Sequence, residues 1–321
     1  MDNYNIFQKF LHDFIFNTKT INQSLFEIEK LIYLKKKEIK KNSHIFITSL
    51  PRSGTTSLLN FIYSSQKYGS LTYKNMPFVL SPNLSKLFHS KNIKKKERMH
   101  GDGILYDVES PEAFDEIFFS NNNEFIKKEL INYLTLILSA KNKLRYLSKN
   151  NFNYKRIELI NSILPNCIFL IPIREPLQQA YSLMNQHIRF SKLQKKNDFI
   201  RRYMNYLGHN EFGLNHKAWN KPIEFQNLYK IEYWLEQWYL FYKNIQNNYQ
   251  LYNNCYFIIY EELVNFDYIK LLLNRIKLDK SEGFNIKYFT NSNKKDLNIN
   301  FSQSIYNKAI NLYDDYKNKF L

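Results

Sequence analysis

The sequence predicts an α/β protein: one doubly wound parallel sheet flanked by helices, forming a single domain with a helical lid or insertion. Short apolar runs typical of buried parallel strands alternate with helical patterns. The length of 321 residues suits one large domain or two modest ones, and no internal repeat divides it. A hydrophobic content of 44% with 17% aromatic residues excludes a disordered chain.

Residues 1–41 are expected to form a helical segment that packs on the main domain, residues 42–321. Within it, Phe7, Phe10, Leu11, Phe14 and Ile15 recur at helical spacing. Packing on the domain explains this apolar face better than binding to a membrane surface. Charged residues interrupt any signal-peptide core, and no run approaches the roughly 18 apolar residues of a membrane-spanning helix. We therefore expect a cytoplasmic protein without a transmembrane segment.

The remaining elements follow from apolar runs and turn residues along the chain. Strands are predicted over 44–49, 167–173 and 255–260, and helices over 55–65, 121–147, 156–164, 231–245 and 302–319. Pro176 is well placed in the first turn of a further helix. The polar, basic stretch around 187–232 is interpreted as the lid or acceptor insertion.

The most informative segment is SLPRSGTTS at 49–57, between the first strand and its helix. Backbone N–H groups at a helix start lack intrahelical partners, and the helix dipole adds positive potential there. A glycine lets the backbone approach an anion closely, and threonines add hydroxyl groups. The segment thus predicts a P-loop-type phosphate cradle made of Arg52, Ser53, Gly54, Thr55, Thr56 and Ser57.

This cradle lacks a residue that ATP-binding loops need. Aligned with G-x-x-x-x-G-K-[ST], the lysine that reaches the β- and γ-phosphates is replaced by Thr55. The loop is therefore poorly equipped for ATP but suits a shorter anionic group, with Arg52 as the cation. A P-loop nucleotide kinase or NTPase remains the alternative function.

A second anion site is predicted where the 167–173 strand ends. Ligands of open α/β sheets bind at this edge. Arg174 can form two parallel hydrogen bonds to a phosphate, and Ser182 on the next helix adds a hydroxyl group. The alternative is an ordinary strand-end arginine paired with Glu175.

Together these segments resemble the PAPS-dependent sulfotransferases, PAPS being 3′-phosphoadenosine-5′-phosphosulfate. PRSGTT at 51–56 resembles the family's 5′-phosphosulfate loop, and Arg174, Pro176 and Ser182 resemble its 3′-phosphate motif. LPN at 164–166 and YEEL at 260–263 match further landmarks in the expected order. Segments at 73–78, 100–103 (HGDG), 110–114 (SPEAF) and 147–151 are similar to a bacterial group of the family.

The resemblance implies a function and a donor. A sulfonate group would move from PAPS to a hydroxyl or amine of a small-molecule acceptor by in-line displacement, releasing adenosine 3′,5′-bisphosphate (PAP). It implies no metal requirement. Arg52 would neutralise charge on the bridging oxygen, while Arg174 and Ser182 would hold the 3′-phosphate.

The general base is not fixed by the resemblance. A glutamate shortly after the loop and a Lys-x-His motif, found in other members, are both absent. His100 or Asp102 in the glycine-rich HGDG segment and Glu109 are the candidates, although Asp beside Gly is also ordinary turn chemistry. Lys74 and Lys149 are candidates for contacting the sulfonate, and His187 and His216 for lining the acceptor pocket, each with a purely structural alternative.

The net charge of +17 leaves a nucleic-acid-binding module as a second alternative function. The lysine-rich runs at 35–41, 91–96 and 294–295 are separate in sequence, which favours solvated surfaces over one binding face. We therefore expect no nucleic-acid partner. Two cysteines, Cys167 and Cys255, are too few for a four-cysteine zinc site and are expected as buried thiols.

Overall fold

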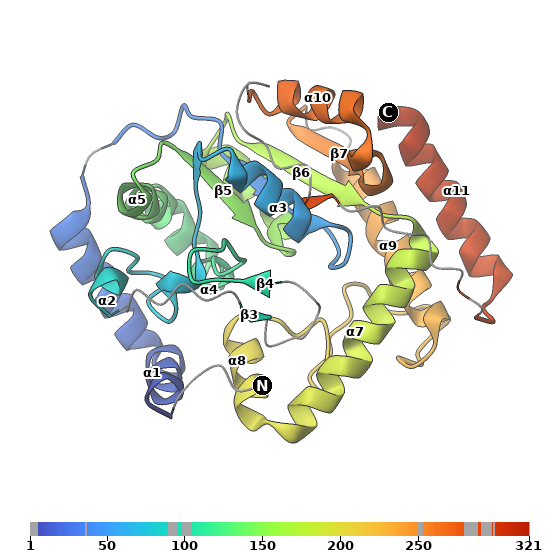
Figure 1. The fold of residues 1–321 in the computed structure, drawn as a ribbon, viewed down its shortest axis with the longest axis horizontal. Coiled ribbons are helices and arrows are strands. Elements are labelled where there is room, and N and C mark those ends of the chain that lie inside the picture. Colours follow the sequence, from blue (N-terminus) through green and yellow to red (C-terminus); the bar gives the residue numbers. More distant parts are fainter. Residues whose placement is uncertain are drawn as a thin grey trace.

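The computed structural model describes residues 6–35, 37–88, 96–97, 105–249, 253–278, 288–289, 297 and 299–320. Within them, five parallel strands form one sheet in the order β2-β5-β1-β6-β7 (Figure 1). The strands are β1 (Ile45–Ile47), β2 (Tyr68–Gly69), β5 (Arg145–Lys149), β6 (Ile168–Ile173) and β7 (Cys255–Ile259). The predicted α/β fold with a parallel sheet is confirmed.

Helices flank this sheet, and some of them follow a strand as the sequence predicted. They are α1 (Ile6–Asn17), α2 (Lys19–Tyr33), α3 (Thr55–Ser64), α4 (Glu116–Phe119), α5 (Asn123–Lys141), α6 (Ile157–Ile163), α7 (Pro176–Lys196), α8 (Asp198–Tyr206), α9 (Ile231–Tyr249), α10 (Phe266–Arg275) and α11 (Gln303–Phe320). A short hairpin pairs β3 (Lys96–Glu97) with β4 (Leu105–Tyr106). In Figure 1 the long α7 runs from the sheet edge down to α8, and α11 lies at the right-hand margin.

The order of the strands fixes where a ligand site can form. β1 lies between β5 and β6, and Ile47 is in register with both Lys149 and Leu170. The chain winds to one side of β1 through β2 and β5 and then to the other through β6 and β7. The carboxyl ends of β1, β5 and β6 therefore meet at the position where open α/β sheets bind ligands.

Two elements differ from the sequence-based expectation for identifiable reasons. The helical pattern over 121–147 ends at Lys141, because Asn142 adopts a left-handed conformation (φ 52°) and Lys143 N–H closes the helix on the Leu138 carbonyl. The residues after it form β5. The predicted insertion at 187–232 begins inside α7, which continues to Lys196.

The N-terminal segment forms two helices that contact the domain. On α1, His12 and Ile15 are buried, and Asp13 accepts hydrogen bonds from Arg202 and Tyr206 of α8. Phe10 and Phe14 remain exposed among the described residues, so the predicted apolar face is only partly covered. The helix therefore packs on the domain with one side of that face, the side that contacts α8.

In the described part of the chain, no helix has the length and apolar character needed to span a bilayer.

Candidate active site at the carboxyl edge of the sheet

The turn after β1 has two residues in left-handed conformations, Arg52 (φ 66°) and Gly54 (φ 93°). Ser53 Oγ donates to the Leu50 carbonyl at 2.8 Å, so this hydroxyl group holds the turn together. Helix α3 starts directly afterwards at Thr55, with the Leu58 N–H bonded to the Gly54 carbonyl. The predicted strand, turn and helix are present, and the unpaired N–H groups of the first helical turn lie beside the loop.

Gly54 is required by a close approach from another part of the chain. A Cβ atom placed there would lie 2.2 Å from Cδ2 of Tyr260, the residue that follows β7. The guanidinium of Arg174 lies 5.4 Å from the centre of the same ring. Tyr260 thus packs against both predicted anion-binding segments, and a side chain at position 54 would displace it.

Buried hydrogen bonds fix the loop to α7 and α9. Gln179 Nε2 donates to the Pro51 carbonyl at 2.9 Å, and its Oε1 accepts from Trp238 Nε1 at 3.0 Å. Ser49 Oγ donates to the Pro172 carbonyl at 2.6 Å. Because these groups are buried, the hydrogen bonds hold Ser49 and Pro51 of the loop against the core.

The two predicted anion-binding segments contact each other. Arg52 Nε donates to Ser182 Oγ at 2.9 Å, and Arg174 Nη1 donates to the Arg52 carbonyl at 3.2 Å. Arg174 Nε is buried and has no hydrogen-bond partner among the described residues. A buried guanidinium donor without a partner is costly and usually marks a place for a ligand or water. Ser57 is half-buried on α3.

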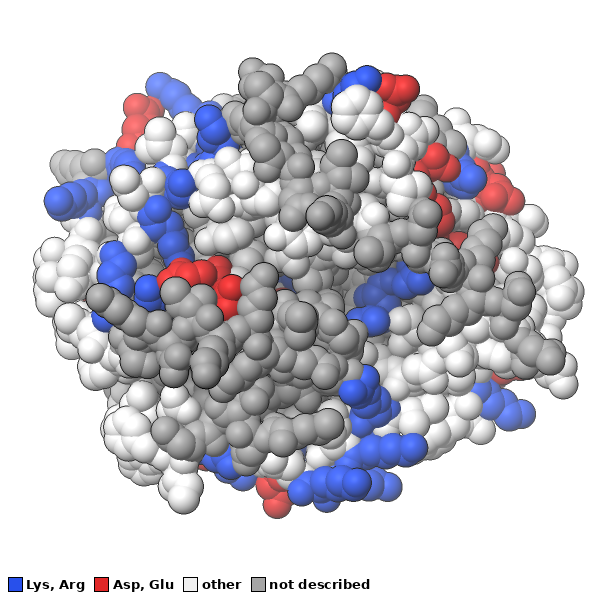
Figure 2. Space-filling model, viewed as in Figure 1, with Lys and Arg blue, Asp and Glu red and all other residues white. Residues whose placement is uncertain are grey.

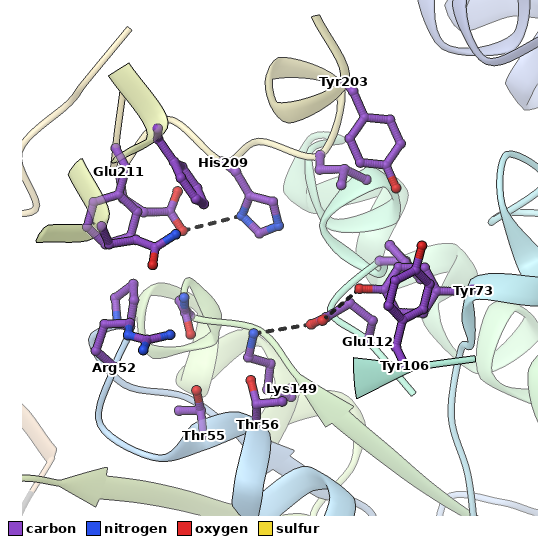
Figure 3. A pocket seen from close by; sticks show the side chains of 17 residues that line it. Arg52, Thr55, Thr56, Tyr73, Tyr106, Glu112, Lys149, Tyr203, His209 and Glu211 are labelled. Carbon is purple, nitrogen blue, oxygen red and sulfur yellow. Dashed lines mark hydrogen bonds and ion pairs between the residues drawn. The ribbon is translucent and has the colours of Figure 1, made fainter. Parts of the chain in front are cut away.

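A cavity of about 100 Å³ opens in front of the loop (Figure 3). This is well above the ~10–15 Å³ that one water molecule requires, so the cavity can admit more than a single water molecule. Its lining combines polar groups from the loop and from β5 with aromatic side chains. The lining residues are Pro51, Arg52, Thr55, Thr56, Tyr73, Tyr106, Glu112, Phe114, Lys149, Asn151, Gln186, Phe190, Tyr203, Leu207, His209, Glu211 and Phe212.

A buried ion pair faces the loop across the cavity floor. Lys149 Nζ lies 3.3 Å from Glu112 Oε1, and both side chains are only 9% exposed. Glu112 Oε2 also accepts from the Tyr73 hydroxyl at 3.2 Å. The end of β5 is held in place by Asn150, whose amide donates to Asp115 and Glu116. Lys149 was a candidate from the sequence, whereas Glu112 was known only as part of the SPEAF segment.

A histidine and a glutamate line the opposite wall of the cavity. His209 Nδ1 lies 3.3 Å from Glu211 Oε1, in the loop that follows α8 (Figure 3). Burial alone would raise the pKa of Glu211, but His209, and farther away Lys149, bring this pKa below its ordinary value. Sequence reasoning missed both residues, because a His-x-Glu spacing in a polar loop has no specific pattern.

The remaining candidates for the general base and for the acceptor pocket have different outcomes. His100 and Asp102 lie outside the described residues. Glu109 is 48% exposed, contacts Lys74 at 2.7 Å and does not line the cavity, because it belongs to the exposed turn before SPEAF. His187 and His216 also lie outside the lining; both rings pack against Trp234 in the aromatic core of the predicted insertion.

The basic side chains on the site face are distributed in groups. Figure 2 shows Lys and Arg at the left and lower edges and inside the hollow right of the centre, not as one continuous stripe. For the described residues of this face, the high net charge therefore adds no support for nucleic-acid binding.

The fold and the loop define the class: an α/β protein with a P-loop-type turn at the switch point of a parallel sheet. A family model described as "Sulfotransferase family" matches residues 44–267, which is more than half of the chain. The chain belongs to the sulfotransferase family, and its activity is sulfonate transfer.

Three solved structures that are similar to this chain are bacterial sulfotransferases or sulfotransferase domains. STF1 from Mycobacterium tuberculosis H37Rv superposes with a TM-score of 0.53 at 11% identity, covering 89% of this chain and 83% of that one. STF9 from Mycobacterium avium gives a TM-score of 0.45 at 10% identity, with coverages of 98% and 79%. The sulfotransferase domain of the Synechococcus PCC 7002 olefin synthase gives 0.42 at 12%, with coverages of 88% and 97%. A comparison with curated proteins found no match.

Proposed function

We propose that the protein transfers the sulfonate group of PAPS to a hydroxyl group of a small-molecule acceptor and releases PAP. The observation that carries this proposal is the contact between the loop and the start of α7. Arg52 donates a hydrogen bond to Ser182, and Arg174 donates one to the backbone of the loop, so the two segments proposed to bind anions lie together. PAPS has two anionic groups, the phosphosulfate and the 3′-phosphate, that match these two segments.

The residues present suit this donor. The N–H groups at the start of α3, with the Thr55 and Thr56 hydroxyls and Arg52, would hold the phosphosulfate. Arg174 and Ser182 would hold the 3′-phosphate, which would give the unpartnered Arg174 Nε an acceptor. PAPS supplies an activated sulfonate whose leaving group is a phosphate.

The transfer is a displacement at sulfur. The acceptor oxygen forms a bond to sulfur while the bond between sulfur and the bridging oxygen breaks, and the electron pair leaves on PAP. Arg52 and the N-terminus of α3 would stabilise the negative charge that develops on that bridging oxygen. By analogy with phosphoryl transfer, most of the rate would come from positioning and charge stabilisation.

A kinase or NTPase is the competing proposal, and the loop argues against it. The position of the nucleotide-binding lysine is Thr55, whose side chain is only 4% exposed. The loop itself, residues 49–57, contains no lysine.

Thermal unfolding with each nucleotide separates the two functions. PAP at about 100 times its Kd would stabilise the folded chain by about 2.7 kcal/mol, a Tm rise on the order of 5 °C, and ATP with Mg²⁺ would not. The opposite pattern would overturn the PAPS proposal. The Arg174→Ala variant should lose most of the PAP effect, whereas Arg201→Ala, on the exposed face of α8, should keep it.

A further inference from the structure

The cavity that faces the phosphate loop contains a histidine with one ring nitrogen oriented by a carboxylate. A carboxylate only accepts hydrogen bonds, so His209 donates from Nδ1 to Glu211 at 3.3 Å and its Nε2 carries the lone pair. Nε2 has no hydrogen-bond partner in the described part of the chain. In Figure 3 the imidazole lies across the cavity from Arg52, Thr55 and Thr56.

The loop that carries this pair is fixed at both ends. Gly208 ends α8 in a left-handed conformation (φ 72°), and His209 N–H bonds the Met204 carbonyl at 2.9 Å. Gly213 (φ 85°) lies so close to Gln194 that a Cβ would be 2.3 Å from its Oε1. The same Oε1 accepts from Leu214 N–H at 2.7 Å. The backbone thus holds His209 and Glu211 in place without help from a ligand.

Glu211 is a buried carboxylate, and glutamate side chains are seldom fully buried unless they are paired. It is 4% exposed, and its Oε2 has no hydrogen-bond partner among the described residues. A buried carboxylate oxygen without a partner destabilises the fold unless a nearby cation compensates. His209 in its protonated form is that cation, so the pair is suited to a histidine that gains a proton during the reaction.

The other carboxylate of the cavity is less suited to accept a proton. Glu112 Oε1 accepts from Lys149 and from the Ala113 N–H, and Oε2 accepts from Tyr73. These interactions stabilise its ionised form and occupy both oxygens. Glu112 therefore acts in the structure as the counterion of Lys149.

The remaining lining describes the acceptor. Six aromatic rings line the cavity: Tyr73, Tyr106, Phe114, Phe190, Tyr203 and Phe212. Its charged groups are already engaged: Lys149 pairs with Glu112, the 4% exposed Glu211 accepts its hydrogen bond from the neutral His209, and Arg52 faces the donor in the proposed function. No charge is left to pair with a charged acceptor, and aromatic walls favour a flat apolar body.

We propose that His209 takes the proton from the acceptor hydroxyl, with Glu211 as its positioning residue, and that the acceptor is an uncharged molecule with a flat apolar body. This proposal rests on the proposed function. The hydroxyl proton moves to Nε2 as the oxygen bonds to sulfur, and the sulfur-to-bridging-oxygen bond breaks with its electrons leaving on PAP. The imidazolium afterwards loses its proton to solvent.

The first test compares His209→Gln with Glu124→Gln, which removes a charge from an exposed residue on α5. His209→Gln should lower kcat by about 10²–10⁴-fold while the Kd for PAP changes less than twofold. Glu124→Gln should match the wild type in both. Wild-type turnover in His209→Gln would overturn the proposal. Failure of the wild type itself to bind PAP would instead contradict the proposed function.

The second test separates a positioning role of Glu211 from a structural one. The charges facing His209 are those of Glu211, Lys149, Arg52 and Glu112, with the Tyr203 hydroxyl nearby. Removing the negative charge in Glu211→Gln should disfavour the protonated imidazole that forms in the reaction, and the acid limb of the kcat profile should move to lower pH. ¹⁵N NMR should show the Nδ1–H form of His209 in the wild type and its partial loss in Glu211→Gln. An unmoved limb and an unchanged ring form would overturn the role of Glu211.

The third test uses three phenols that differ in charge: 4-ethylphenol, 3-(4-hydroxyphenyl)propionate and tyramine. The wild type should prefer neutral 4-ethylphenol by at least tenfold in kcat/KM, because each charged analogue must bury an unpaired charge. Equal or better use of either charged phenol, or use of none of the three by an enzyme that binds PAP, would overturn the proposed acceptor class.

Discussion

Arg52 Nε donates a 2.9 Å hydrogen bond to Ser182 Oγ, which joins the phosphate loop after β1 to the first half of α7. The two residues are 130 positions apart in sequence. The bond exists because β1 and β6 are neighbours in the sheet, so the loop after one lies beside the helix after the other. Changes in either segment are therefore expected to affect both anion subsites.

Substitution of Arg52 tests the charge that the loop contributes to transfer. Arg52→Ala should lower kcat by roughly 10²–10³-fold, because it removes the cation expected beside the bridging oxygen. The fold should persist, since Arg52 is half-buried and its backbone contact to Arg174 remains. Steady-state kinetics and a thermal unfolding curve check both points. Unchanged kcat would contradict the assigned role.

Arg174 should act mainly on donor binding. Its Nε lacks a partner, and the proposed 3′-phosphate lies away from the sulfur that reacts. Arg174→Ala should raise the KM for PAPS about 10–100-fold, the equivalent of a charge-assisted hydrogen bond of about 1.5–3 kcal/mol. The exposed Arg201→Ala serves as the matched control. A fall in kcat without a rise in KM would refute the assignment.

Gly54 should be intolerant of a side chain for two reasons. Its φ of 93° strains any other residue, and an added Cβ would lie 2.2 Å from the Tyr260 ring. Gly54→Ala should reduce the free energy of unfolding by about 1–3 kcal/mol and abolish donor binding. The double variant with Tyr260→Ala should recover part of the stability, as measured by urea unfolding. Purely additive losses would show that the ring contact does not matter.

His44 predicts a pH dependence of stability that is independent of the active site. It is fully buried; its Nε2 donates to the Ile39 carbonyl and its Nδ1 accepts from Tyr146 N–H, so the ring must be neutral. Burial lowers the His44 pKa from 6.5 to about 4. Below pH 6.5 the unfolded chain therefore binds a proton that the folded chain does not, and stability falls as the pH falls.

The size of this effect follows from the shift. At pH 4 the loss should approach about 3 kcal/mol, since one pKa unit corresponds to about 1.4 kcal/mol. Other groups titrate in the same range, so the measurement is the difference between the wild type and His44→Gln in urea unfolding at pH 7 and pH 4. Parallel pH dependences in the two proteins would contradict the prediction.

Much of the fold could be predicted because its signals are local. β6 is a continuous apolar run buried along its whole length, and Pro176 sets the start of α7. The predicted end of a helix was wrong where a single residue terminates the element, as Asn142 does at the end of α5. The loop residues and Arg174 could be identified because a strand end, a glycine turn and a helix start are adjacent in sequence.

The sequence by itself determined β1, β6 and β7, the phosphate loop and the family resemblance, since these depend on short runs of neighbouring residues. Only the tertiary structure decided which distant side chains share the cavity. It brought Glu112 to Lys149 and placed the His209–Glu211 pair opposite Arg52, while Glu109, three residues from Glu112, stayed outside the lining. The physical reason is that strand order and long-range packing, not local preference, select the side chains that meet at the carboxyl edge of the sheet.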